Sequence, residues 1–559
     1  MITTTKKGVR NFVQNCVESG VTHVVCSPGS RNAPLVIALD QHPEIITYVI
    51  HDERSAAFFA LGLSQALGRP VGVTCTSGSA VVNYYPAVTE AYYQNIPLVV
   101  MSADRPANMI NQGDGQTIMQ ERIFGDHVLG YMSIEENPEF TADINKDIKD
   151  LLLKSNGEWK GPVHFNFPLT EPLYETEEVS IEKLNLEEND DHQLDEISDA
   201  FISKWDNAER KMILVGQMMP SDRRVMLLKE LASDPSVVVL TESTSNTIDP
   251  KFNHCIDRSL AAIPAEQKAD FEPNLLITLG GAIVSKRVKE FLRNAPAITE
   301  HWNVSTAFPD MDTYFRKTEQ VQLETNYFLQ QLLNKKSGVP KSNFGSKWKQ
   351  LDYLNQERLM EYKSDLPFSD FLAFDIILDS IPEDTYVHLA NSTPVRYAQL
   401  FDPIKGITYL SNRGTSGIDG SVSTAVGFAA ATPEKVNVVI TGDVSFFYDS
   451  NALWNAYLGS NVKIVLINNS GGGIFRFIEG PSKTPQLEKY FEAKHFHSAK
   501  HLCAAFGLEY FSANDYVSVE KGMADLLQYG DKPSLLEVFT PNEVNAVVLR
   551  NFFKILNRS

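Results

Sequence analysis

The chain has 559 residues, which is enough for three or four domains of ordinary size. Its 43% hydrophobic and 21% charged residues argue against global disorder. The formal net charge of −20 argues against a general nucleic-acid binder, because polyanions select broad basic surfaces. This charge still leaves room for arginines concentrated in one pocket.

Nothing in the sequence indicates secretion or membrane insertion. The five cysteines are scattered without a CxxC pair, so neither a disulfide framework nor a cysteine metal site is expected. The first residues lack the apolar segment of a signal peptide, and no apolar run approaches the ~20 residues of a membrane helix. We therefore expect a cytoplasmic protein that binds no nucleic acid and has no stable membrane span.

The first third of the chain repeats one pattern. A short β-branched run is followed by a turn containing glycine, serine or aspartate, and then by a segment of helical period. These runs are Thr22–Cys26, Ile46–Ile50, Val71–Cys75 and Leu98–Ser102. Strands that alternate with helices at this spacing predict βαβ units and a parallel sheet.

Two polar segments divide the remainder of the chain. The acidic stretch Glu175–Glu196 is typical of a solvated connector, and Asn334–Ser346 is typical of a second linker. Apolar runs on either side of these linkers predict further strands, at Lys211–Val215, Leu275–Leu279, Val436–Ile440, Val462–Ile467 and Ser534–Thr540. We predict an α/β protein with three doubly wound parallel-sheet domains, at residues 1–180, 195–335 and 345–559.

Two dipeptides at the ends of neighbouring predicted strands indicate a magnesium site. Gly442-Asp443 ends one strand and Asn468-Asn469 ends the next, with a helix expected between them from about Asp449 to Leu458. A right-handed crossover places both dipeptides at one edge of the sheet. A carboxylate, an amide oxygen and the Gly471 carbonyl suit Mg²⁺ and leave positions for a diphosphate. Either dipeptide alone would be an ordinary turn.

This segment resembles the signature of thiamine-diphosphate enzymes, in which GD is followed about two dozen residues later by NN. The resemblance implies thiamine diphosphate as coenzyme and Mg²⁺, with Mn²⁺ as an alternative metal, held by Asp443, Asn469 and Gly471. Val444 stands where most members of that family have a glycine. The coenzyme-binding residues that the resemblance implies are Glu53, Ile418, Gly442, Asp443, Val444, Asn469, Gly471, Gly472, Ile474 and Phe475.

Glu53 is the candidate proton-transfer group. Thiamine catalysis needs a carboxyl group that hydrogen-bonds the coenzyme's aminopyrimidine, and Glu53 lies between the strand Ile46–Ile50 and an apolar helix. Considered alone, Glu53 is also typical of an acidic residue at a helix N-terminus. Its flanks, HDER, TSGSAVVN and ADRP, resemble the pyrimidine-binding domain of thiamine enzymes, which makes Glu53 the catalytic glutamate. In that family Ile418 would support the bent coenzyme.

The resemblance also implies the arrangement of domains and subunits. The first domain would bind the pyrimidine ring and the third the diphosphate, with a central domain between them. Such enzymes pair the first domain of one subunit with the third domain of another. We therefore expect a homo-oligomer, either a dimer or a tetramer, with active sites between subunits.

Basic residues at several strand-end turns predict the class of substrate. Arginine's planar fork suits carboxylates, so arginines gathered on the loops of one cleft predict substrates with several carboxylates. SPGSRNAPL, NSTPVR and SNRGTSGIDG closely resemble one branch of the thiamine family. The substrate-binding residues that this resemblance implies are Ser30, Arg31, Arg105, Gln116, Lys286, Arg287, Ser392, Arg396 and Arg413.

That branch implies a transferase of menaquinone biosynthesis. It decarboxylates 2-oxoglutarate and adds the remaining fragment to isochorismate, and both are dicarboxylates. Two alternatives stay open. One is another thiamine-dependent 2-oxo-acid carboligase or decarboxylase, similar to acetolactate synthase, which would need fewer basic residues. The other is a metabolite-binding module without catalysis on the same fold.

Overall fold

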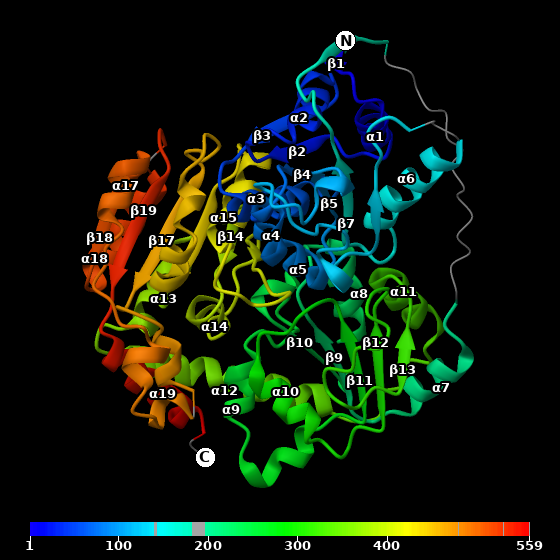
Figure 1. Cartoon of the computed structure of the whole chain (residues 1–559). Coiled ribbons are helices and arrows are strands. Elements are labelled where there is room, and N and C mark those ends of the chain that lie inside the picture. Colours follow the sequence, from blue (N-terminus) through cyan, green and yellow to red (C-terminus); the bar gives the residue numbers. More distant parts are fainter. Residues whose placement is uncertain (139–141, 181–195, 479, 529, 558–559) are drawn as a thin grey trace.

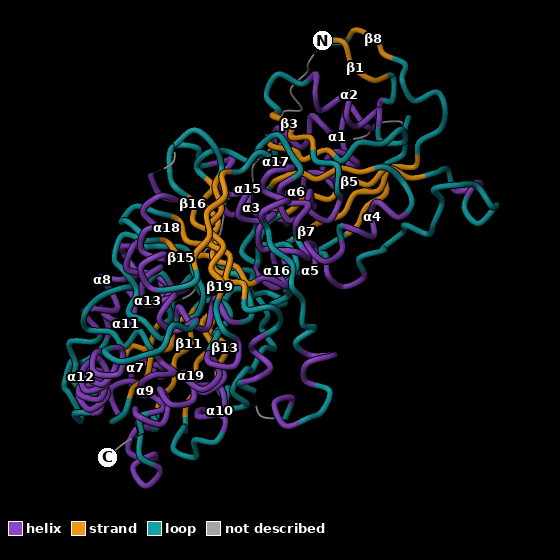
Figure 2. The backbone as a smooth tube through the Cα atoms, turned by 90° about the vertical axis from the view of Figure 1, so that its left-hand side faces the viewer, coloured by secondary structure: helices purple, strands orange, loops and turns teal. Residues whose placement is uncertain are grey.

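The computed structural model describes residues 1–138, 142–180, 196–478, 480–528 and 530–557. It contains three parallel sheets, each covered by helices, which lie in the upper, lower and left parts of Figure 1. Figure 2 shows the same sheets as separate groups of strands surrounded by helices. The predicted α/β class with three doubly wound domains is confirmed.

The first sheet has the strand order β3-β2-β4-β5-β7-β6. Its strands are β2 (His23–Cys26), β3 (Ile46–Val49), β4 (Val71–Cys75), β5 (Leu98–Asp104), β6 (Tyr131–Ser133) and β7 (Pro162–Pro168). The helices of this part are α1 (Lys7–Glu18), α2 (Ala33–Gln41), α3 (Glu53–Leu67), α4 (Ser79–Asn83), α5 (Tyr85–Gln94) and α6 (Ala142–Ser155). β4 and β5 are buried along their whole length, as expected for strands covered on both faces.

The second sheet has the order β10-β9-β11-β12-β13. Its strands are β9 (Lys211–Val215), β10 (Val237–Thr241), β11 (Leu275–Leu279), β12 (Glu300–Val304) and β13 (Glu319–Val321). Its helices are α7 (Asp199–Asn207), α8 (Asp222–Leu231), α9 (Ile256–Ala261), α10 (Lys286–Arg293) and α11 (Thr325–Lys335). The long helix α12 (Phe344–Lys363) buries Phe344 and Trp348 in the core of this sheet and also contacts the last helix of the chain.

The third sheet has the order β15-β14-β16-β17-β19-β18. Its strands are β14 (Tyr386–Leu389), β15 (Thr408–Leu410), β16 (Asn437–Gly442), β17 (Val462–Asn468), β18 (Glu509–Ala513) and β19 (Ser534–Phe539). Its helices are α13 (Asp370–Ser380), α14 (Thr393–Ala398), α15 (Ser421–Ala431), α16 (Asp443–Tyr448), α17 (Lys500–Phe506), α18 (Tyr516–Gln528) and α19 (Asn542–Leu556). The strand order matches that of the first sheet, so the two domains share one topology.

Helices α3 and α15 join the first and third domains through close backbone contact. A Cβ atom added to Gly62 of α3 would lie 1.9 Å from the carbonyl oxygen of Thr424, and one added to Gly427 of α15 would lie 2.0 Å from that of Phe59. Because glycine has no side chain, the two helix backbones can approach to this distance. The first turn of α3 is thereby fixed relative to the loop that precedes α15.

Two expectations from the sequence are corrected by the structure. The helix expected from about Asp449 to Leu458 is instead α16, which begins at Asp443 and is followed by a single 3-10 turn at Ser450–Leu453. The reason is that the Asp449 carboxylate accepts hydrogen bonds from the backbone and hydroxyl of Ser423, which ties it to α15 instead of to a helix of its own.

The predicted connector Glu175–Glu196 was also only partly right. Its first residues form the strand β8 (Thr176–Glu178), which pairs antiparallel with β1 (Ile2–Thr4). The three residues of β8 are solvent-exposed, as expected for an acidic segment, but backbone pairing with the N-terminal strand was not predicted. Residues 181–195 of this segment lie outside the described part of the chain.

Candidate functional site

The carboxyl ends of β16 and β17 bring the predicted metal ligands together. These strands are parallel neighbours, and Asp443 opens α16 directly after β16. One Asp443 carboxylate oxygen accepts a hydrogen bond from the backbone N–H of Gly471 at 2.9 Å, and the other accepts one from Val444 at 2.7 Å. Asp443, Asn469 and the loop at Gly471 therefore form one cluster, although residues 444–468 separate them in sequence.

This cluster fits a divalent cation with a diphosphate. Asp443 and Asn469 are 2% and 5% exposed, and the side-chain oxygen Oδ1 of Asn469 has no hydrogen-bond partner among the described residues. A buried acceptor without a donor is costly unless a ligand satisfies it. Oxygen donors of this kind are the ones that Mg²⁺ prefers.

The loop after Asn469 packs closely against the backbone of Glu492. Gly471 has a φ of 147°, which glycine adopts without strain, and an added Cβ atom would lie 2.6 Å from the carbonyl oxygen of Glu492. The backbone N–H of Gly472 donates to that same carbonyl at 2.7 Å. Residue 471 can therefore only be glycine in this conformation.

Two further residues beside the cluster were not predicted from the sequence. Asp370, at the start of α13, is buried and accepts a hydrogen bond from the Asn469 amide at 3.2 Å. Burial raises the pKa of Asp370 to about 6. His495 Nε2 lies 3.4 Å from the Asp443 carboxylate, and the interaction with this carboxylate raises the pKa of the imidazole. Neither residue belongs to a sequence motif, so only folding reveals them.

Glu53 begins α3 and is half-buried. The preceding Asp52 caps the helix by accepting from the backbone N–H of Arg54 at 2.9 Å and of Ser55 at 3.4 Å, which frees the Glu53 side chain from a capping role. No described residue donates a hydrogen bond to the Glu53 carboxyl group in the structure. This carboxyl group lies close enough to Tyr84 to raise the phenol's pKa further, although burial is the main cause of that rise.

The first turn of α3 is held against the end of α16. Asp52 accepts a hydrogen bond from Asn451 at 2.6 Å, and Arg54 donates to the carbonyl oxygen of Tyr448 at 2.6 Å. Because α16 has six residues, its two ends are about 9 Å apart. Glu53 and Asp443 of one chain thus lie toward opposite ends of this short helix.

Ile418 lies beside the first turn of α16. Its side chain is 38% exposed, and its carbonyl oxygen accepts a hydrogen bond from the Ser445 hydroxyl at 2.6 Å in the first turn of α16. Gly442, which precedes α16, has no atom within 4 Å of an added Cβ position, so the space beside it is open.

The predicted substrate residues of the first domain form one group. Arg31 is buried, donates to the carbonyl oxygen of Leu169 at 3.1 Å and pairs with Glu171 at 3.1 Å. Burial lowers its pKa, and the nearby Arg105 lowers it further. Arg105 donates to the carbonyl oxygen of Gly115 at 3.2 Å, directly before Gln116. Ser30, next to Arg31, is solvent-exposed.

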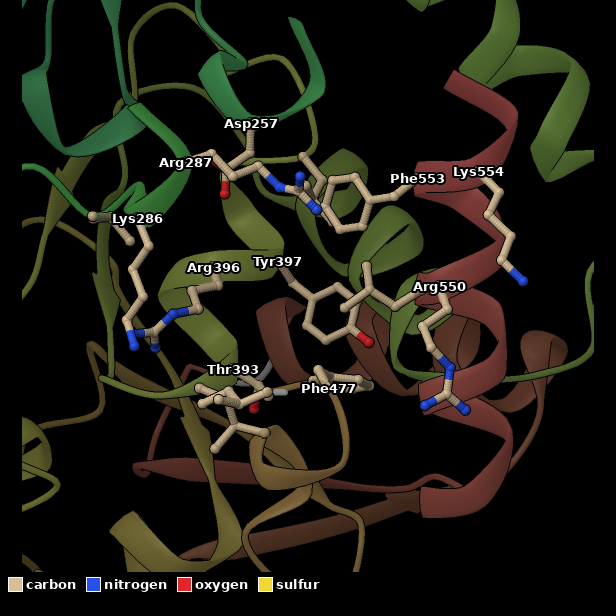
Figure 3. A pocket seen from close by; sticks show the side chains of 15 residues that line it. Asp257, Lys286, Arg287, Thr393, Arg396, Tyr397, Phe477, Arg550, Phe553 and Lys554 are labelled. Carbon is tan, nitrogen blue, oxygen red and sulfur yellow. The ribbon is translucent and has the colours of Figure 1, made fainter. Parts of the chain in front are cut away.

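A second group lines a cavity of about 350 Å³ between the second and third domains (Figure 3). Lys286, Arg287 and Arg396 contribute its cationic side, together with the predicted apolar residue Ile474. Arg396 donates to the carbonyl oxygen of Ser392 at 2.5 Å. Burial lowers the pKa of Arg396 to about 10, and the charge of Arg413 acts in the same direction.

Arg413 and Phe475 of the third domain are among the predicted residues that do not line this cavity. Arg413 donates to the Asn391 side chain at 2.6 Å and lines a neighbouring cavity of about 510 Å³. Phe475 packs its ring against Phe491, with the centroids 5.7 Å apart. None of Ser30, Arg31, Arg105 or Gln116 lines the cavity of Figure 3, so a single chain does not join the two groups there.

The C-terminal helix supplies cavity residues that the sequence did not reveal. Arg550 and Lys554 lie one turn apart on α19 and line the cavity on the side opposite Lys286 and Arg396 (Figure 3). Phe553 of the same helix packs under the Arg287 guanidinium, 4.2 Å from its ring centroid. The sequence shows the i, i+4 spacing of Arg550 and Lys554, but it does not show that α19 packs beside this cavity.

These features define a class of protein, the thiamine-diphosphate enzymes. The family model described as "Thiamine pyrophosphate enzyme, N-terminal TPP binding domain" matches residues 6–125, and its C-terminal counterpart matches residues 392–538. "Middle domain of thiamine pyrophosphate" matches residues 182–365. The solved structure of benzoylformate decarboxylase from Polynucleobacter necessarius resembles the fold, with a TM-score of 0.72, 15% identity and coverage of 96% and 98% of the two chains.

Closer relatives narrow the class to one family. The 2-succinyl-5-enolpyruvyl-6-hydroxy-3-cyclohexene-1-carboxylate synthase of Flavobacterium johnsoniae is 44% identical over 98% of both chains. The protein of the same name from Christiangramia forsetii is 42% identical, again over 98% of both chains. The chain therefore belongs to the 2-succinyl-5-enolpyruvyl-6-hydroxy-3-cyclohexene-1-carboxylate synthase family, as the sequence motifs predicted.

Proposed function

We propose that this enzyme decarboxylates 2-oxoglutarate and adds the resulting succinyl-semialdehyde carbanion in 1,4 fashion to isochorismate, within menaquinone biosynthesis. Family membership supports the reaction, since its relatives carry the name of that product. The substrate class is supported by the cavity of Figure 3. Five cationic side chains line this cavity, and Asp257 is its single acidic lining residue. Such a cavity suits dicarboxylates.

The coenzyme and its metal have defined positions in this proposal. Asp443, Asn469 and the Gly471 carbonyl would hold Mg²⁺, or Mn²⁺ in its place. The unpaired Oδ1 of Asn469 supports this ligand set. When bound, thiamine diphosphate supplies the electron sink that allows carbon dioxide to leave a 2-oxo acid.

The protein's own groups orient the reactants and move the proton. The Glu53 carboxyl group would hydrogen-bond the aminopyrimidine nitrogen and transfer its proton there, a role supported by the absence of any described protein donor to this group. Ile418 would support the ring from the side of α16, where Ser445 holds its backbone. Lys286, Arg287 and Arg396 would bind substrate carboxylates, and Ile474 would shield the reacting carbon from water.

We further propose that the active enzyme is a homo-oligomer, a dimer or a tetramer, with active sites between subunits. The separation of the two basic groups supports this arrangement. Within one chain, Arg31 and Arg105 of the first domain do not line the cavity that Lys286, Arg287 and Arg396 line. Apolar side chains are also exposed on β3 and at Trp454, which stacks on His51. Ile46, Val49 and Trp454 are 52%, 47% and 50% exposed, which is typical of a surface that a partner covers.

The cytoplasm is the compartment that we propose for this enzyme. All five cysteines are free and buried, which fits a reducing environment. No helix in the described ranges is both long and apolar enough to span a bilayer.

The decisive experiment supplies thiamine diphosphate, Mg²⁺, 2-oxoglutarate and isochorismate, and follows the loss of isochorismate together with the release of carbon dioxide. We expect both to occur at equal rates. An acetolactate-synthase-like activity is the alternative, and it would instead consume pyruvate without isochorismate. Lys286→Ala should raise the KM for a dicarboxylate, whereas Arg223→Ala, which removes an exposed arginine on α8, should not. A folded, coenzyme-loaded enzyme that leaves isochorismate untouched would disprove the substrate assignment.

A further inference from the structure

The amide of Asn469 is held in one orientation. Its nitrogen Nδ2 donates to Asp370 at 3.2 Å, whereas its oxygen Oδ1 is buried and has no partner in the described part of the chain. The two ends of an amide have almost the same shape, so packing alone does not decide which end faces a ligand. Hydrogen bonding decides it here, because only the oxygen can bind a cation.

Asp370 is the group that imposes this orientation. An ionised carboxylate accepts hydrogen bonds and donates none, so the end of Asn469 that faces Asp370 must be the NH₂ end. The other end, Oδ1, is then left without a partner among the described residues and can bind a ligand. Turning the amide around would bring the Asn469 oxygen against a carboxylate oxygen and would place two N–H donors in the metal site.

Asp370 is itself fixed by a network from β19 and α19. Its second carboxylate oxygen accepts from the Thr540 hydroxyl at 2.5 Å, and its backbone N–H donates to the Asn545 side chain at 2.8 Å. Asn545 also donates to the Thr540 hydroxyl at 3.3 Å, which closes the network. Asp370 is 0% exposed, so water cannot replace these partners.

We infer that Asp370 is a positioning residue that turns the Asn469 oxygen toward the metal and so sets the metal affinity of the enzyme. The inference rests on the proposed magnesium site. It assigns a function in the reaction to a residue in no recognised motif, 73 positions before Asp443 in the chain. Groups that orient a ligand in this way commonly change metal affinity about 10- to 100-fold when they are removed.

The test measures Mn²⁺ binding to the full chain saturated with thiamine diphosphate, using the electron paramagnetic resonance signal of free Mn²⁺. We expect Asp370→Ala to raise the Kd for Mn²⁺ by about tenfold or more. Asp370→Asn should stay close to the wild type. Its amide oxygen can accept from Asn469 while its nitrogen donates to the Thr540 hydroxyl, which accepts as readily as it donates.

The control variant is Asn437→Ala. Asn437 is buried at the opposite end of β16 and bonds to His388 at 2.9 Å, so its loss destabilises the same domain without reaching the metal cluster. Its Kd for Mn²⁺ should match that of the wild type. If Asp370→Ala does not fold, Asp370→Leu replaces it, since leucine fills the space and accepts no hydrogen bond.

Each outcome is decisive. An unchanged Kd in Asp370→Ala, or a Kd in Asp370→Asn raised as much as in Asp370→Ala, would overturn the orienting role. Recovery of activity by excess Mg²⁺ in Asp370→Ala would support it, because a misfolded domain is not rescued by metal. Failure of the wild type itself to bind Mn²⁺ in the presence of thiamine diphosphate would instead disprove the proposed metal site.

Discussion

The contact between α3 and α15 gives a sharp prediction for Gly62→Ala. The new methyl carbon would lie 1.9 Å from the Thr424 carbonyl oxygen, whereas ordinary van der Waals contact begins at 3.4 Å. The helices must therefore separate by about 1.5 Å at this point. Both partners are backbone, so no side-chain rotation relieves the clash. Gly427→Ala meets the Phe59 carbonyl oxygen at 2.0 Å and should behave in the same way.

Two opposing effects determine the size of the change. Alanine stabilises the interior of a helix by about 1 kcal/mol relative to glycine. Forcing an extra methyl group into a packed contact costs about 1–3 kcal/mol or more. Because the clash is with backbone, we expect a cost at the upper end of this range and a net loss of about 2 kcal/mol in the free energy of unfolding. Because α3 begins at Glu53 and α15 follows Ile418, the affinity for thiamine diphosphate should fall as well.

The assay combines urea unfolding of the apo protein with tryptophan fluorescence titration of thiamine diphosphate. Gly157→Ala is the control, since its added Cβ atom meets nothing closer than 3.6 Å. The reasoning would be refuted by a Gly62→Ala protein that is more stable than the wild type and binds the coenzyme equally well. Helix propensity alone would produce that result.

Three further predictions concern single side chains. Glu53→Gln should leave folding and coenzyme binding intact but lower the rate of carboligation by about 10²- to 10⁴-fold, the usual contribution of proton transfer. The control is Glu44→Gln, which changes an exposed glutamate. Equal rates in the two variants would contradict the role of Glu53. Arg550→Ala should raise the KM for one of the two dicarboxylates by about three- to tenfold, with little change in kcat. The effect is modest because water screens the charge of this exposed arginine. A fall in kcat alone would contradict a role of Arg550 in substrate binding. Glu242 accepts hydrogen bonds from the backbone N–H groups of residues 284 and 285, and burial raises the pKa of its carboxyl group to about 7. The folded state therefore keeps a proton that the unfolded state releases near the ordinary pKa of 4.5. The stability that this proton contributes is therefore full below pH 4.5 and is lost as the pH rises through 7, with a slope of up to about 1.4 kcal/mol per pH unit. Glu242→Gln should remove this slope from the pH dependence of the free energy of unfolding, measured in urea. Identical slopes in the two proteins would show that Glu242 does not titrate.

The strands of this protein could be predicted from sequence because each is a short β-branched run with a turn at its end. The run Val71–Cys75 coincides with β4, and Lys211–Val215 coincides with β9. The segment after Asp443 was predicted incorrectly, because Asp449 bonds to Ser423 of a neighbouring helix. Local periodicity carries no information about such a contact.

The metal cluster shows how far the sequence alone reaches. Asp443 and Asn469 follow adjacent strands, and the parallel βαβ rule places such residues at one sheet edge, so their meeting follows from the sequence. Their surroundings do not. Asp370 reaches Asn469 from 99 residues away, through a helix start that no motif marks.

The sequence by itself therefore determined the fold class, the family and the candidate ligands, because these depend on strand-end positions and on motifs that are continuous in the chain. Only the tertiary structure decided how the basic residues are grouped. It placed Arg550 of the last helix opposite Lys286 and kept Arg31 out of that cavity. It also brought α3 against α15 through Gly62. Such contacts depend on how separate helices pack, and packing is set by the shapes of surfaces that meet only after the chain has folded.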